Sequence, residues 1–158
     1  MGLREVAERE LQDGLARLRG AHLNGTLPLR QAVLNDLLRL AGAAPQDLRL
    51  ELGADNEVVA RYGVLHFTAR IHREVALAPT PVLTIELASR VAAWALQQAS
   101  LPPFARVTGR HIRIDLSRVP ALRAAAPLWP HVARLAVTSR SGRLDLHVTI
   151  HVRDEEQQ

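Results

Sequence analysis

The sequence RLDLHVTIHV at residues 143–152 decides the fold class, because hydrophobic and polar side chains alternate through it without a break. Its hydrophobic positions are Leu144, Leu146, Val148, Ile150 and Val152. Successive side chains of a strand point to opposite faces of a sheet, so the pattern predicts a strand with one buried and one solvated face. Ser141-Gly142, just before it, predicts a hairpin turn.

The same two-residue period recurs upstream, in segments separated by turn residues. The predicted strands cover residues 48–52, 58–62, 65–77, 83–87, 104–108 and 111–116. Asp55-Asn56 predicts the turn between the first two, and Gly63 a bulge before the third. Arg73 is the one charged residue on the apolar side of the third strand.

Helical periods flank these strands. The spacing predicts amphipathic helices over residues 3–19, 29–41 and about 89–100. In the third, Ser89 is the expected cap, and Val91, Trp94 and Ala95 form the expected buried side. Residues 23–29 are expected to begin extended, and the proline-broken residues 117–131 to form short helical turns.

These elements predict a single α+β domain spanning residues 1–158. We expect one long, twisted antiparallel sheet of about six strands wrapped around packed helices, since no βαβ alternation suggests a parallel sheet. Residues 1–20 carry an additional N-terminal amphipathic helix. The acidic tail over residues 154–158 is expected to be frayed.

Composition narrows the class of partner. The chain has 158 residues, 47% of them hydrophobic and 23% charged, with no cysteine and a net charge of +4. All 20 basic residues are arginines, yet many have acidic neighbours, as in Arg9-Glu10 and Arg73-Glu74, which argues against nucleic-acid binding. Neither a membrane span nor a signal peptide is apparent, so we expect a cytoplasmic protein.

The search for chemistry finds no catalytic or nucleotide-binding motif, so we expect no enzyme and no cofactor. His147 and His151 share a strand face but lie roughly 13 Å apart, too far to share one ion. A site built from His111, Asp115, Asp145 and His147 requires their strands to pair in register. The favoured interpretation is a solvated sheet face that holds no metal.

Two polar residues interrupt apolar surfaces. Arg73 falls on the apolar side of a strand, and Asn35 lies among leucines of the second helix. The favoured interpretation is that Arg73 lies at a sheet edge or extends its guanidinium to solvent, and that Asn35 caps or bonds a neighbouring loop. The alternative makes either residue a polar anchor at the mouth of an apolar cavity.

Two segments resemble a known family. The run Gly25-Thr26-Leu27-Pro28-Leu29 leading into a helix, and Thr108–Ser117 followed by a proline-broken segment and a hairpin, are similar to small bacterial single-module members of the tubular lipid-binding (TULIP) superfamily. The resemblance covers most of residues 20–152. It implies a strongly curved sheet wrapped around a long helix, an apolar groove for lipid chains, and no catalytic residues.

We therefore expect non-catalytic binding of a lipid or fatty acid in an apolar groove between helix and curved sheet. Burial of the alkyl chain would supply the affinity. The alternative is a protein–protein scaffold or homodimerisation module with no small-molecule ligand. The candidate ligand-binding residues are Val33, Leu37, Leu65, Phe67, Ile71, Arg73, Val91, Trp94 and Leu146.

Overall fold

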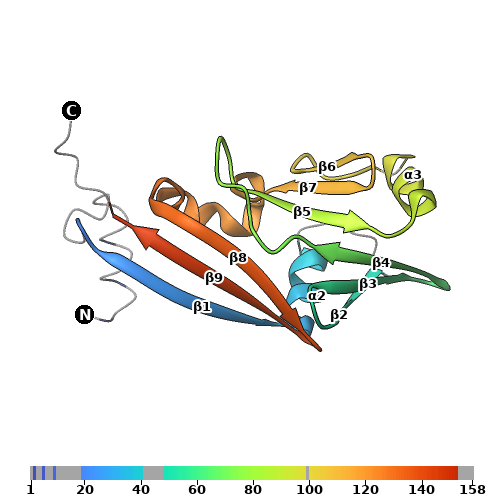
Figure 1. The fold of residues 1–158 in the computed structure, drawn as a ribbon, viewed down its shortest axis with the longest axis horizontal. Coiled ribbons are helices and arrows are strands. Elements are labelled where there is room, and N and C mark those ends of the chain that lie inside the picture. Colours follow the sequence, from blue (N-terminus) through green and yellow to red (C-terminus); the bar gives the residue numbers. More distant parts are fainter. Residues whose placement is uncertain are drawn as a thin grey trace.

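The computed structural model describes residues 19–40, 48–98 and 100–152, together with Gly2, Glu5 and Arg9 (Figure 1). The expected N-terminal helix over residues 3–19 falls almost wholly outside these residues, and the expected frayed tail over 154–158 falls wholly outside them. Within them the chain is α+β but mostly β, with nine strands.

Apart from β1, which was not predicted as a strand, and β4, which is shorter than predicted, the elements follow the predicted order with bounds that differ by a few residues. They are β1 (His22–Arg30), α2 (Gln31–Leu40), β2 (Leu48–Leu52), β3 (Glu57–Tyr62), β4 (Leu65–Ile71), β5 (Val82–Leu87), α3 (Arg90–Gln98), β6 (Ala105–Thr108), β7 (His111–Asp115), the 3₁₀ segments η2 (Leu116–Arg118) and η3 (Pro120–His131), β8 (Val132–Arg140) and β9 (Arg143–His151).

The strands form two antiparallel sheets, so the prediction of one sheet of about six strands is wrong. The larger sheet has the order β2-β3-β4-β5-β7-β6, and the smaller has the order β1-β9-β8 (Figure 1). Residues 22–30, expected to be extended only at first, pair with β9 along their whole length. Alternation predicts where strands lie, but it carries no information about which sheet each strand joins.

The larger sheet has two chemically different faces, as predicted. Strand register aligns Leu50, Ala60 and Phe67 in one row of the apolar face. On the opposite face it aligns Arg70, Glu86 and His111. One-sided burial of this kind is typical of an antiparallel sheet.

The chain joins the two sheets directly after β4. The prediction of one strand over residues 65–77 is wrong, because the chain leaves the larger sheet at Ile71 and continues along β8. There the Val137 N–H donates to the Arg73 carbonyl (2.7 Å), and the Val75 N–H donates to the Leu135 carbonyl (3.0 Å). The charged residue that interrupted the apolar pattern marks the place where the chain changes sheets.

The main core lies between the two sheets. Leu52, Val58 and Ile71 from the larger sheet pack with Val137 and Leu144 from the smaller one, and Val137 is 1% exposed. Trp129 and Leu34 lie at the margin of this cluster. A second sheet therefore covers much of the surface that the sequence assigned to helices.

Helix α2 covers the open edge of the larger sheet with two polar side chains. The Leu52 N–H donates to Gln31 Oε1 (2.8 Å), and the Leu50 N–H donates to Asn35 Oδ1 (2.8 Å). Four residues of helix and two residues of strand both span roughly 6 Å, so the two side chains match alternate strand positions. An uncovered strand edge invites pairing with another chain, and these contacts prevent it.

Helix α3 is capped as predicted but turned differently. The Ala92 N–H donates to Ser89 Oγ (3.3 Å). The buried residues are Ala92 and Ala93, whereas Val91 is 73% and Trp94 64% exposed, so the predicted buried side is wrong. Ala93 packs against Ala69 and Leu87, where small side chains let the helix approach the sheet.

Candidate functional site

The side chain of a buried asparagine, Asn56, makes hydrogen bonds to both sheets. Asn56 occupies the left-handed backbone region (φ 63°), which asparagine tolerates better than most residues. Its Nδ2 donates to the carbonyls of Ile71 (3.0 Å) and Val137 (2.8 Å), and its Oδ1 accepts from the Ser139 N–H (2.7 Å). One amide thus bonds both sheets from within the core.

The β8–β9 hairpin is held at its tip as well. Ser139 Oγ donates to the Gly53 carbonyl (2.7 Å), and the Gly142 N–H donates to the Leu52 carbonyl (2.9 Å). The Gln31 N–H in turn donates to the Gly142 carbonyl (3.0 Å). The hairpin predicted from Ser141-Gly142 is confirmed, and these bonds fix it against β2 and α2.

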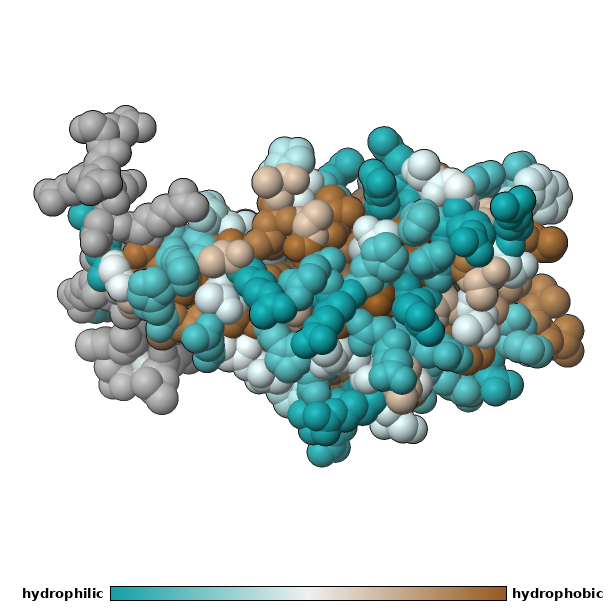
Figure 2. All heavy atoms as spheres, in the orientation of Figure 1, coloured by the Kyte–Doolittle hydropathy of each residue, from teal (hydrophilic) through white to brown (hydrophobic). Residues whose placement is uncertain are grey.

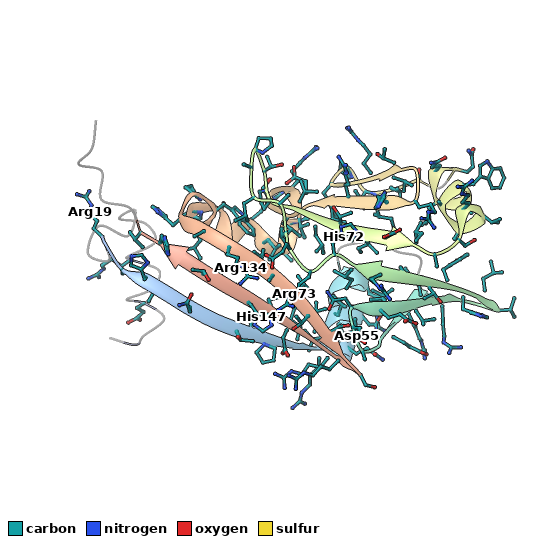
Figure 3. All side chains as sticks on the ribbon, in the orientation of Figure 1. Arg19, Asp55, His72, Arg73, Arg134 and His147 are labelled. Atoms are coloured by element: carbon teal, nitrogen blue, oxygen red, sulfur yellow. The ribbon has the colours of Figure 1, made fainter. Side chains whose placement is uncertain are left out.

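A polar cleft of about 610 Å³ opens beside this joint, and we call it the junction cleft. Figure 3 shows Asp55, His72 and Arg73 around the crossing of the sheets, and Figure 2 shows mostly hydrophilic side chains over the same part of the visible face. The cleft is lined by Asp55, Asn56, Arg70, Ile71, His72, Arg73, Glu74, Glu86, Thr138 and Ser139.

Charges of both signs line the junction cleft. Arg134 on β8 donates two hydrogen bonds to the Glu74 carboxylate, one from Nε to Oε2 (3.1 Å) and one from Nη2 to Oε1. These bonds lower the pKa of the Glu74 carboxyl below its ordinary value, against a smaller opposing effect of desolvation. Arg73 lies exposed in the cleft, with its backbone paired to β8, which agrees with the edge position favoured for it.

Three side chains with metal-ligating atoms meet at the edge of the cleft. His72, Glu86 and His111 each place one ligand atom within 4.8 Å of the others. His72 Nε2 lies 3.7 Å from Glu86 Oε2, and the two imidazole rings meet edge to face with centroids 5.7 Å apart. Arg110 Nη2 donates to the other Glu86 oxygen (3.2 Å).

The metal site considered from the sequence does not form. His111 and Asp115 lie on β7 of the larger sheet, whereas Asp145 and His147 lie on β9 of the smaller sheet. Asp115 caps η2 by accepting from the Ser117 N–H (3.0 Å). His147 sits between two threonines, with Nδ1 3.1 Å from Thr26 Oγ1 and Nε2 2.8 Å from Thr138 Oγ1.

The candidate ligand-binding residues lie in several places. Ile71 and Arg73 line the junction cleft, and Leu146 packs at the margin of the main core. Phe67 is half-buried and Leu65 is 54% exposed on the apolar face. Val33 lies 44% exposed on α2, where the Leu37 side chain is outside the described part of the structure. Val91 and Trp94 face outward on α3.

Asn35 provides no anchor for a ligand. Its Oδ1 accepts from the Leu50 N–H, and its Nδ2 donates to the Leu50 carbonyl (3.0 Å). The favoured interpretation, a bond to a neighbouring segment, is confirmed.

Sequence reasoning missed the cluster of His72, Glu86 and His111 and the role of Asn56. Glu86 and His111 lie on the polar side of their strands, and His72, just past the end of β4, continues the polar side of that strand. The alternation of polar and apolar residues predicts this. The missing information was the order β4-β5-β7, which places the three side by side. The sequence predicts only a turn at Asn56, because no local pattern indicates its hydrogen bond to a carbonyl 81 residues away.

No protein-family model, curated protein or solved structure matches this chain. The resemblance to the tubular lipid-binding superfamily therefore stays a prediction. Among the residues that the structure describes, no helix is both long enough and apolar enough to cross a membrane.

Proposed function

We propose that this protein binds a hydrophobic ligand, a lipid or fatty acid, in an apolar groove between helix α2 and the curved larger sheet, without catalysing a reaction. The proposal rests on one observation: the apolar face of the larger sheet is buried at one end and exposed to solvent at the other. This face is closed where Leu52, Val58 and Ile71 meet the smaller sheet, and open where Leu65 stands at the β3–β4 hairpin.

Half-covered apolar positions support this proposal. Four positions that share this face with Leu65 are only partly buried: Leu48, Leu50, Ala60 and Phe67. Figure 2 shows hydrophobic surface at the end of the β3–β4 hairpin, away from the hydrophilic junction cleft. A contiguous open apolar surface is typical of a binding site.

The expected energetics follow from alkyl burial. Each buried CH₂ contributes about 0.8 kcal/mol, so eight of them give roughly 6 kcal/mol before the costs of association. Arg73 lines the opposite, polar cleft, and Asn35 is already bonded, so neither is expected to hold the polar head. Affinity should therefore depend on chain length more than on the head group, rising about fourfold per added CH₂.

Native mass spectrometry of the full chain tests this proposal. Saturated fatty acids of increasing length are added, and the masses of bound and free protein are compared before and after denaturation. Leu65→Asn is expected to weaken binding about tenfold or more. Val64→Asn, at the neighbouring and almost fully exposed position, should leave it unchanged.

Two results would count against lipid binding. One is a clean subunit mass with every fatty acid. The other is an unmodified protein that forms a dimer and binds no fatty acid, together with a Leu65→Asn variant that is a monomer. That result would favour the homodimerisation alternative.

A further inference from the structure

The polar face of the larger sheet holds the ligand set for a metal ion. Glu86 on β5 is the register partner of His111 on β7. Just past the end of β4, the His72 N–H donates to the Thr84 carbonyl (2.9 Å), so His72 continues the pairing of β4 with β5. His72 therefore lies on the same face as Glu86. We propose that His72, Glu86 and His111 bind a divalent transition metal, with Zn²⁺ as the best-matched ion. Two imidazoles and one carboxylate form a common zinc ligand set.

The present geometry is near that of a loaded site. Nitrogen and oxygen ligands lie 2.0–2.2 Å from Zn²⁺, hence roughly 3.4 Å from one another in a tetrahedral site. His72 Nε2 and Glu86 Oε2 are 3.7 Å apart, and all three ligand atoms lie within 4.8 Å. Small side-chain rotations would close the set on an ion, while the three neighbouring backbones stay paired.

The ligand types and the residues around Glu86 indicate which class of ion the site would bind. Arg110 holds one Glu86 oxygen, leaving Oε2 beside His72, as an outer hydrogen bond does for a metal-ligating carboxylate. Arg70 is the register partner of Glu86 on the other side. Because the set holds two imidazoles and a single carboxylate, the site suits an ion bound mainly by nitrogen ligands. Ca²⁺ and Mg²⁺, which need several oxygen ligands, fit it poorly.

The site also opens onto a cleft. His72 and Glu86 both line the junction cleft, so three protein ligands would leave a coordination position facing it. Water or an anionic ligand would occupy that position, with Arg70 and Arg73 in the same cleft.

The first experiment titrates the chelator-treated, untagged full chain with Zn²⁺ and follows the imidazole ¹⁵N signals of its seven histidines. We expect one equivalent of Zn²⁺ to shift the signals of His72 and His111. Shifts confined to other histidines would overturn the proposal. The pair His22 and His151, whose ring centroids lie 4.0 Å apart, is the competing location.

Variants then measure the contribution of each ligand. Loss of an outer hydrogen-bond partner costs 10–100-fold in metal affinity, so His72→Asn and His111→Asn should each cost at least about 100-fold. His66→Asn is the matched control, because His66 lies on the same face near the start of β4, six residues and roughly 20 Å before His72. Unchanged Zn²⁺ affinity in both ligand variants, each shown to be folded by circular dichroism, would contradict the assignment. So would tighter binding of Ca²⁺ than of Zn²⁺.

Discussion

The two ends of the apolar face carry the same sequence pattern but differ in cover. At the junction end, Ile71 is 6% exposed beneath the smaller sheet, whereas at the hairpin end Leu65 is 54% exposed on the same strand. Alternation of hydrophobic residues is equally regular at both. Burial of each end therefore depends on where the β8–β9 hairpin docks, and the sequence of β4 alone does not determine that position.

A few polar contacts fix the position in which the smaller sheet docks onto the larger one. Asn56 bonds Ile71, Val137 and Ser139, and the hairpin tip bonds Leu52 and Gly53. Buried polar groups must be satisfied by partners of matching geometry, so these bonds specify one position for the smaller sheet. No comparable set of contacts among the described residues holds a second layer over the hairpin end.

The largest expected effect comes from removing the junction amide. Asn56→Gly keeps a residue that adopts positive φ but leaves two carbonyls and one N–H without their partner. We expect unfolding free energy, measured by chemical denaturation, to fall by about 4 kcal/mol. Asp55→Gly is the matched control, since Asp55 also has positive φ (53°) but is exposed, and it should change stability by less than about 1 kcal/mol. Equal effects would mean that the turn matters and the amide does not.

Two alanine variants compare the two ends of the apolar face directly, and the expected loss of unfolding free energy is intermediate. Ile71→Ala removes a fully packed side chain and is expected to cost about 3 kcal/mol, because a cavity is left between the sheets. Leu65→Ala should cost less than about 1 kcal/mol, because solvent already reaches half of that side chain. The same denaturation measurement checks both, and a similar loss for the two variants would show that the hairpin end is covered in solution.

The smallest effect concerns the ion pair on the crossover segment. Glu74→Gln should lower the melting temperature slightly at neutral pH, because it removes the charged partner of Arg134. The pKa of Glu74 is lowered in the folded protein, so its contribution is present above the ordinary carboxyl pKa and is lost as the pH falls through the lowered value. Melting curves of the two proteins should therefore converge in acid. A gap that widens with falling pH would contradict this assignment.

Much of the fold could be predicted from local pattern. The two-residue period predicts most strands, though not β1, while Ser141-Gly142 predicts the last hairpin and Ser89 the start of α3. These signals are local, since side-chain parity and caps depend on neighbouring residues. The same reasoning failed on α3, where burial depends on the alanine side that fits against Ala69 and Leu87.

The candidate sites were harder, because both depend on strand order. His72, Glu86 and His111 become neighbours only once β4, β5 and β7 are adjacent, and the junction cleft exists only once β8 lies beside residues 73–75. Of the proposed apolar positions, Leu65 and Phe67 share a face that parity alone predicts. Val91 and Trp94 were included from a helical face that the structure turns outward.

Methyl NMR shows directly whether a hydrophobic ligand occupies the open end of the apolar face. The Leu, Val and Ile methyl signals are followed while a long-chain fatty acid is added to the full chain. We predict shifts at Leu65, Leu48 and Leu50, with Ile71 and Val137 little changed. Absence of shifts, or shifts confined to Val91 on α3, would contradict the proposed function.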